Sequence, residues 1–90
     1  MVDQDLVKRC QLGEEGAFDS LYMAVFKKAF WTAYLLSGNT EKSEDIIQET
    51  FYECFRDIGK LRNPELFQAW FNRILVRKCR KTAVVRRFIS

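Results

Sequence analysis

The stretch EDIIQETFYECF, residues 44–55, decides the fold, because its apolar residues recur with the period of an α-helix. Four apolar positions fall within about 60° of one another around a helix axis. They are Ile47, Phe51, Cys54 and Ile58. A single apolar face of this kind is typical of a helix packed against a core. The pattern predicts a helix from about Thr40 to Ile58, with Asn39 or Thr40 as its N-cap.

The other side of this helix is polar and spans about 100°. It carries Asp45, Gln48, Glu49, Tyr52 and Arg56. A solvated surface is the simpler interpretation, since charged residues commonly lie opposite a core face. The presence of Gln48 and Tyr52 among the carboxylates favours a surface that binds another protein, because tyrosine is enriched at interfaces.

Three more helices are predicted, two before this one and one after it. A short helix covers about residues 3–12 and ends at Gly13, and a second runs from Glu14 and Glu15 to Leu36, where Ser37-Gly38-Asn39 breaks it. A fourth begins at Asn63-Pro64, with Asn63 as its N-cap. Strand-like alternation is not visible over any useful length. The 90 residues therefore predict one compact all-α domain with a short first helix and three longer ones.

The apolar residues of the second and fourth helices predict the rest of the core. In the second helix they are Phe18, Leu21, Tyr22, Val25, Phe26, Ala29, Phe30, Ala33 and Leu36. In the fourth they are Leu66, Phe67, Trp70, Phe71 and Ile74. Beyond Leu75 the apolar stripe stops, and Arg77, Lys78 and Lys81 occupy its sector, so we expect this helix to outrun the core.

Charge is distributed unevenly along the chain. The net charge is +3, but residues 1–65 hold eight basic and twelve acidic residues, whereas residues 66–90 hold seven basic and no acidic ones. A basic segment of this kind indicates contact with phosphates; a solubilising tail is the alternative. The segment between the third and fourth helices adds two cations, an amide and an exposed apolar side chain, a combination suited to an unpaired base. The candidate DNA-binding residues are Lys60, Leu61, Arg62, Asn63, Arg73, Arg77, Lys78, Arg80 and Lys81.

Other classes of function find little support in the residues. There is no histidine, no CxxC pair among the three cysteines and no phosphate-binding glycine loop, so we expect no metal, no cofactor and no enzymatic activity. The chain has no uninterrupted apolar run of membrane-spanning length, and its first ten residues do not resemble a signal peptide. We therefore expect a cytoplasmic protein without membrane insertion and with free thiols.

Three segments carry a resemblance to a known family. DLVKRCQLGEEGAFDSLY, EDIIQETFYECF and FQAWFNRIL follow one another in the order and spacing of a bacterial extracytoplasmic-function (ECF) sigma factor. The chain resembles its region 2, the promoter-melting domain, over about residues 3–82. The central segment, followed by FxxWFxRI, is the more specific part of the match.

The resemblance implies roles for both charged surfaces. In the family, the helix matching residues 44–56 docks on the clamp helices of the largest RNA polymerase subunit. Asp45, Gln48 and Glu49 match polar positions of that motif, whereas Tyr52 and Arg56 are added from the helix geometry. The loop matching residues 60–63 captures a base flipped from the non-template strand of the −10 element, and the last helix lies along the same DNA. Phe67 and Trp70 match aromatic positions that anchor this helix.

The chain also departs from the family pattern. Family members often carry Asn seven residues after the Trp and Asp eleven residues after it, where this chain has Arg77 and Lys81. A contact to phosphate or a guanine edge is more plausible for Arg77 than amide readout, so the family's −10 preference is not carried over. The second domain, which reads the −35 element, is absent, and a linker is expected to begin at residues 82–90. Excision from a longer protein is the simpler account.

The predicted function is a transcription initiation module. We expect it to bind the RNA polymerase core, to recognise and melt the −10 element on the non-template strand, and to be held by an anti-sigma factor. The alternative is a protein-interaction module that an anti-sigma inhibitor binds and that lacks autonomous DNA recognition. A duplex-binding helical domain ranks below both, because no recognition helix preceded by a tight turn is evident.

Overall fold

A computed structural model describes residues 2–89, and the side chains of residues 2–81 within that range. Its α-helices are α1 (Gln4–Gln11), α2 (Ala17–Ser37), α3 (Thr40–Asp57) and α4 (Phe67–Ile89), with short 3-10 turns at Ile58–Lys60 and Pro64–Leu66. No strand occurs between residues 2 and 89. Within this range no helix is long and apolar enough to cross a membrane.

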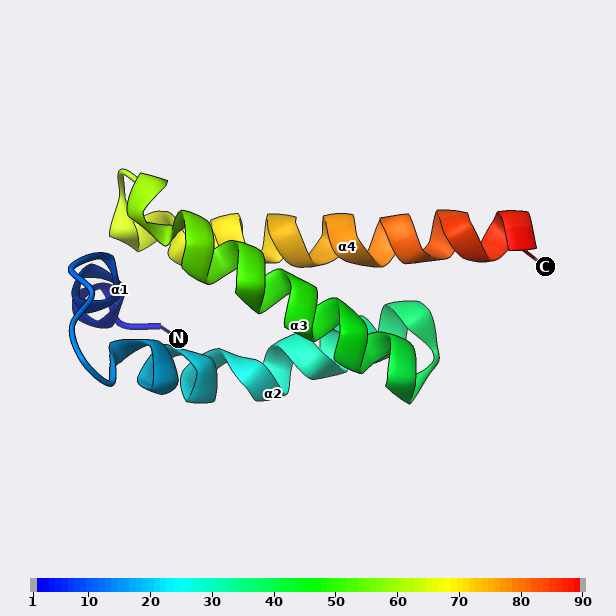
Figure 1. The fold of residues 1–90 in the computed structure, drawn as a ribbon, viewed down its shortest axis with the longest axis horizontal. Helices are drawn as coiled ribbons and strands as arrows, with labels where there is room; N and C mark the ends of the chain where they lie inside the picture. Colours follow the sequence, from blue (N-terminus) through cyan, green and yellow to red (C-terminus); the bar gives the residue numbers. More distant parts are fainter. Residues whose placement is uncertain (1, 90) are drawn as a thin grey trace.

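The three long helices run back and forth along the long axis of the molecule (Figure 1). The middle one, α3, lies obliquely between α2 and α4 and packs against both. The short α1 packs at one end, beside the start of α2 and the two 3-10 turns. The backbone of α4 continues past the turn that joins α2 to α3. The side chains of residues 82–90, where we expected a linker to begin, lie outside the described part of the chain.

Local sequence sets most helix ends. The Asp3 carboxylate accepts from the Asp5 N–H at 3.0 Å, and the Asn39 side chain accepts from the Lys42 N–H at 2.9 Å, so both act as N-caps. Gly38 ends α2 in the left-handed conformation, with φ 69°, and its N–H donates to the Tyr34 carbonyl at 2.7 Å. The expected cap at Asn63 is wrong: its side chain makes no capping bond, and a 3-10 turn precedes α4.

The core lies where α2, α3 and α4 meet, with α1 closing one end. Its largest fully buried side chains are Phe67, Phe71, Leu21, Ile46 and Leu75. The predicted core face of α3 is confirmed, because Ile47, Phe51, Cys54 and Ile58 are all buried. The four-helix, all-α prediction is likewise confirmed.

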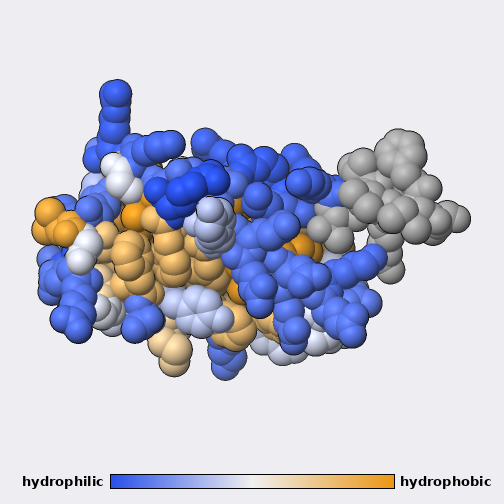
Figure 2. Space-filling view, viewed as in Figure 1, coloured by the Kyte–Doolittle hydropathy of each residue, from blue (hydrophilic) through white to orange (hydrophobic). Residues whose placement is uncertain are grey.

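Aromatic side chains fill the seam between α2 and α3. Phe18 meets Phe55 with ring centroids 4.8 Å apart, and Tyr22 meets Phe51 at 4.6 Å. Phe18, Phe55 and Phe26 are only half-buried, and Tyr22, which was predicted to lie in the core, is 37% exposed. Apolar surface is accordingly visible where α2 and α3 lie side by side (Figure 2).

Three predicted core boundaries are wrong. Leu36 is 56% exposed, because α2 turns a different face to α3 at its last turn, where Ser37 is buried and shares a 3.0 Å hydrogen bond with Ser43. Leu66 is 52% exposed, because it lies in a 3-10 turn rather than in the α-helix. The apolar stripe of α4 does not stop at Leu75, since Cys79 is buried one turn later.

Candidate functional site

The outer face of α3 carries the five predicted protein-binding residues, and all five are exposed. Gln48, Glu49, Tyr52 and Arg56 line a shallow hollow of about 350 Å³, together with two residues that belong to a salt bridge described below. Asp45 lies on the same exposed side but is not among the residues that line the hollow. Tyr52 is 69% exposed, which leaves its ring available to a partner.

Arg56 is already engaged within its own helix end. Its Nε and Nη2 atoms donate to the two carboxylate oxygens of Asp57 at 3.0 and 2.8 Å, and Lys60 adds an ion pair to Asp57 at 3.5 Å. The hydrogen bonds from Arg56 lower the pKa of Asp57 to about 2, against the opposing effect of desolvation, and the charge of Lys60 adds to the shift. The guanidinium also lies 5.8 Å from the centre of the Tyr52 ring. Arg56 therefore stiffens this face as well as charging it.

Glu53 of α3 connects this helix to the basic residues of α4, a role that the sequence pattern did not predict. Its Oε2 accepts from Arg77, and its Oε1 pairs with the Lys78 amine at 3.1 Å, so one carboxylate of α3 holds two consecutive cations of α4. Burial raises the pKa of Glu53, but the hydrogen bonds and charges of Arg77 and Lys78 outweigh it and lower that pKa overall. Position 53 lies at the border between the apolar and polar faces of α3, where periodicity gives no clear indication of a role.

We expect Glu53→Gln to lower the free energy of unfolding by about 1 kcal/mol at neutral pH, because it leaves the two cations of α4 without their carboxylate. Since the folded-state pKa of Glu53 is lowered, its stabilisation is present above the unfolded-state pKa and is lost as pH falls through the folded-state value. Urea unfolding at pH 7 and at about pH 3 should therefore show a difference between wild type and variant that shrinks in acid. A difference independent of pH, or one equalled by Glu44→Gln at an exposed site of α3, would contradict this role.

The predicted DNA-binding loop is mostly exposed. Lys60, Arg62 and Asn63 face solvent, but the expectation of an exposed apolar side chain at Leu61 is wrong, because Leu61 packs partly against the core. The Gln11 amide of α1 donates to the carbonyls of Ile58 at 3.0 Å and Leu61 at 2.7 Å. The loop backbone is thus fastened to α1 while its polar side chains remain accessible.

Basic side chains lie along one face of α4, C-terminal to this loop. Arg73, Arg77 and Arg80 line a hollow of about 430 Å³ with Val76 between them, and Lys81 is exposed one residue further on. Lys78 differs from the others, since its side chain is only 19% exposed and pairs with Glu53 on the α3 side. It lines the hollow of α3 rather than that of α4. Three arginines thus line one depression, and guanidinium groups have the hydrogen-bond geometry that suits phosphate.

The three cysteines are buried within the helical core. Burial, with a smaller contribution from Cys10, raises the pKa of Cys54 to about 12, and burial also raises the pKa of Cys10 and Cys79. Thiols in this state are poor nucleophiles and poor metal ligands. Within residues 2–81 no group of acidic or cysteine side chains is arranged to hold a metal ion.

Comparison with known proteins shows the family to which this arrangement of helices belongs. The family model for sigma-70 region 2 matches residues 21–87, which is most of the chain. The chain belongs to the sigma-70 region 2 family. It is 30% identical over 84 residues to the RNA polymerase sigma-H factor of Pseudomonas aeruginosa, a match that covers 93% of this chain and 44% of that protein.

Two further relatives are ECF RNA polymerase sigma-E factors. The one from Haemophilus influenzae is 33% identical over 78 residues, covering 84% of this chain and 40% of that protein, and the one from Escherichia coli K12 is 32% identical over 78 residues, covering 84% and 39%. No solved structure matches the chain significantly. The chain spans less than half the length of the curated relatives that it matches. The resemblance to region 2 of an ECF sigma factor is confirmed.

In this region 2 domain the candidate residues separate into two surfaces. The face of α3 and the loop with the arginines of α4 are joined across the helix pair by Glu53 and its partners.

Phe67, which the resemblance treats as an anchor, is buried, and Trp70 is half-buried with its ring 6.0 Å from that of Phe67. Both aromatics therefore pack rather than present a stacking surface.

Proposed function

We propose that the chain is a transcription initiation module, which docks on the RNA polymerase core through the outer face of α3 and holds unpaired −10 DNA with the loop and α4. The observation that carries this proposal is the arginine hollow. Three arginines line one hollow on α4, the helix that follows an exposed loop with two cations and an amide, in a domain of the sigma-70 region 2 family. The second cluster, on α3, leaves a separate exposed face for a protein partner.

The proposed mechanism requires no catalytic residue, because binding drives the opening of the duplex. Extruding a base costs a few kcal/mol, and a pocket that stacks and hydrogen-bonds the base offsets that cost. Lys60 and Arg62 in the loop, with the arginines of α4, add sequence-independent affinity by releasing counterions from the phosphates. The isolated domain is expected to bind DNA weakly, and simultaneous attachment to the polymerase core raises the effective concentration of the site.

The decisive test compares the salt dependence of binding to a single-stranded non-template oligonucleotide. Arg73→Gln with Arg80→Gln removes two cations from the hollow and leaves the pair between Arg77 and Glu53 in place. We expect weaker binding and a plot of log K against log salt that is shallower by about 1.4, because each lost phosphate contact changes the slope by about 0.7 on single strands. Fluorescence anisotropy at several salt concentrations, with the polymerase core present, measures both quantities.

A matched control removes two cations elsewhere. Lys8→Gln with Lys27→Gln changes the net charge equally at exposed positions of α1 and α2. This control should retain the wild-type slope if the hollow of α4 is the phosphate surface. An equal loss of slope in both variants would reduce DNA binding to a general effect of net charge and overturn the proposed site.

A second candidate function rests on the exposed apolar residues of α2. Met23 is 77% exposed, Trp31 54% and Leu35 78%, an unusual concentration of large apolar side chains on one solvated helix. Such a surface supports a module that an anti-sigma inhibitor binds. Failure to bind single-stranded DNA even with the polymerase core present would favour this function over the first.

A further inference from the structure

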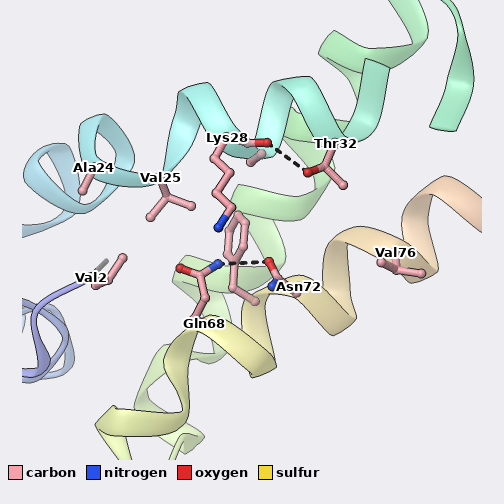
Figure 3. A pocket seen from close by; sticks show the side chains of 10 residues that line it. Val2, Ala24, Val25, Lys28, Thr32, Gln68, Asn72 and Val76 are labelled. Atoms are coloured by element: carbon pink, nitrogen blue, oxygen red, sulfur yellow. Dashed lines mark hydrogen bonds between the residues drawn. The ribbon is translucent and has the colours of Figure 1, made fainter. Parts of the chain in front are cut away.

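A pocket between α2 and α4 is not used by the surfaces described so far. It has a volume of about 220 Å³ and lies between the middle of α2 and the first turns of α4. Figure 3 shows the polar side chains at its mouth, with Lys28 extending from α2 towards Gln68 and Asn72 of α4. Val25, Ala29 and Phe71 supply an apolar interior. The pocket thus combines an apolar wall with a rim of two amides and one cation.

The two amides are arranged so that each leaves part of its capacity for a ligand. The Gln68 Nε2 donates to the Asn72 Oδ1 at 3.0 Å. Within the described side chains, this is the only hydrogen bond of either side-chain amide, so the Gln68 oxygen and the Asn72 nitrogen remain available. Exchanging oxygen and nitrogen in both amides preserves the bond and still leaves one donor and one acceptor. The rim therefore offers a neighbouring donor and acceptor in either assignment.

This combination matches an unpaired nucleobase. The pairing edge of every base carries adjacent hydrogen-bond donors and acceptors, and its faces are apolar. Lys28 is exposed beside the amides and offers a positive charge to the phosphate of the same nucleotide. The Thr32 hydroxyl donates to the Lys28 carbonyl at 3.0 Å, so the Thr32 side chain is bonded to the backbone of its own helix.

The pocket adjoins the arginine hollow of α4. Val76 lines both, with Asn72 and Gln68 one and two turns before it and Arg73 and Arg80 on the adjoining face of the same helix. A single strand whose phosphates lie along the hollow therefore passes the mouth of the pocket. We infer that the pocket receives an unpaired base of the strand that α4 holds, at a position different from the base taken by the loop. This inference rests on the proposed function, since it requires single-stranded DNA on α4.

Abasic substitution tests this base pocket directly. A labelled non-template oligonucleotide is made with one abasic site at each position in turn, and binding is measured with the polymerase core present. For wild type we expect two positions whose loss weakens binding by about tenfold, one for the loop and one for the pocket. In Gln68→Leu with Asn72→Leu, the penalty at the second position should disappear while the first persists. Gln4→Leu, an exposed amide of α1, should retain both penalties.

The outcomes separate the pocket from the function on which it depends. An identical abasic profile in wild type and in the double variant overturns the base pocket and leaves DNA binding by α4 intact. Failure of wild type to bind the strand at all overturns both. If the melting temperature of the double variant falls, Gln68→Met carries the same test, because it keeps the length of the side chain without adding charge and removes both polar atoms of the amide.

Discussion

Replacing Asp45 and Glu49 by lysine is expected to abolish binding of the chain to the RNA polymerase core while leaving the helical content unchanged. Both carboxylates are exposed on α3, so their replacement removes no core contact. Reversing two charges within one interface places like charges against a partner surface that complements the acidic face, which costs several kcal/mol. Pull-down with purified core detects the loss, and circular dichroism reports the helical content.

The control for this charge reversal is Glu14→Lys with Glu15→Lys. These residues lie exposed in the turn before α2 and give the same change in net charge. The control should bind the core as wild type does. Retained binding after reversal of Asp45 and Glu49 would remove the α3 face as the docking surface, and equal loss in the control would attribute the effect to total charge.

Phe51→Ala is expected to lower the free energy of unfolding by about 3–5 kcal/mol. Phe51 is 4% exposed, and its ring meets those of Tyr22, Phe55 and Phe71 at centroid distances of 4.6, 5.6 and 5.2 Å. Truncation leaves a cavity where α2, α3 and α4 meet. At about 0.05–0.15 kcal/mol per residue, such a loss is a large share of the stability of a domain of this size.

Equilibrium urea unfolding measures this effect, with Tyr52→Ala as the neighbouring control. Tyr52 is 69% exposed, so its truncation should change the stability by no more than about 0.5 kcal/mol. Tyr52→Ala should still weaken polymerase binding, which separates the two faces of α3 by two different readouts. Comparable destabilisation in both variants would contradict the assignment of Phe51 to the centre of the core.

The features that the sequence predicted correctly are those that depend on residues close together within or next to one helix. The buried face of α3, its cap at Asn39 and the break at Gly38 each depend on residues within a few positions of one another. The exposed polar face of α3 followed from the same angles. These features were readable because hydrogen bonding within a helix fixes the direction of each side chain relative to its neighbours.

Features that depend on how two helices cross could not be predicted from the sequence. The bridge from Glu53 to Arg77 and Lys78 joins residues 24 and 25 positions apart, and nothing in either segment alone pairs them. Leu36 and Leu66 continue an apolar pattern, but their positions next to a turn and in a 3-10 turn direct them outward. Gln68 and Asn72 carry no charge, and their amides become a candidate site only because α2 faces them.

The hydrogen bonds of Gln11 have a consequence for the order in which the chain acquires its final form during translation. The glutamine leaves the ribosome long before its two acceptors, which lie 47 and 50 positions further along. The 58–61 segment is therefore fastened late, only after the chain has been made at least as far as Leu61. A carboxylate at position 11 has no proton to donate and would repel both carbonyls, so Gln11→Glu unfastens that segment without touching any residue in it.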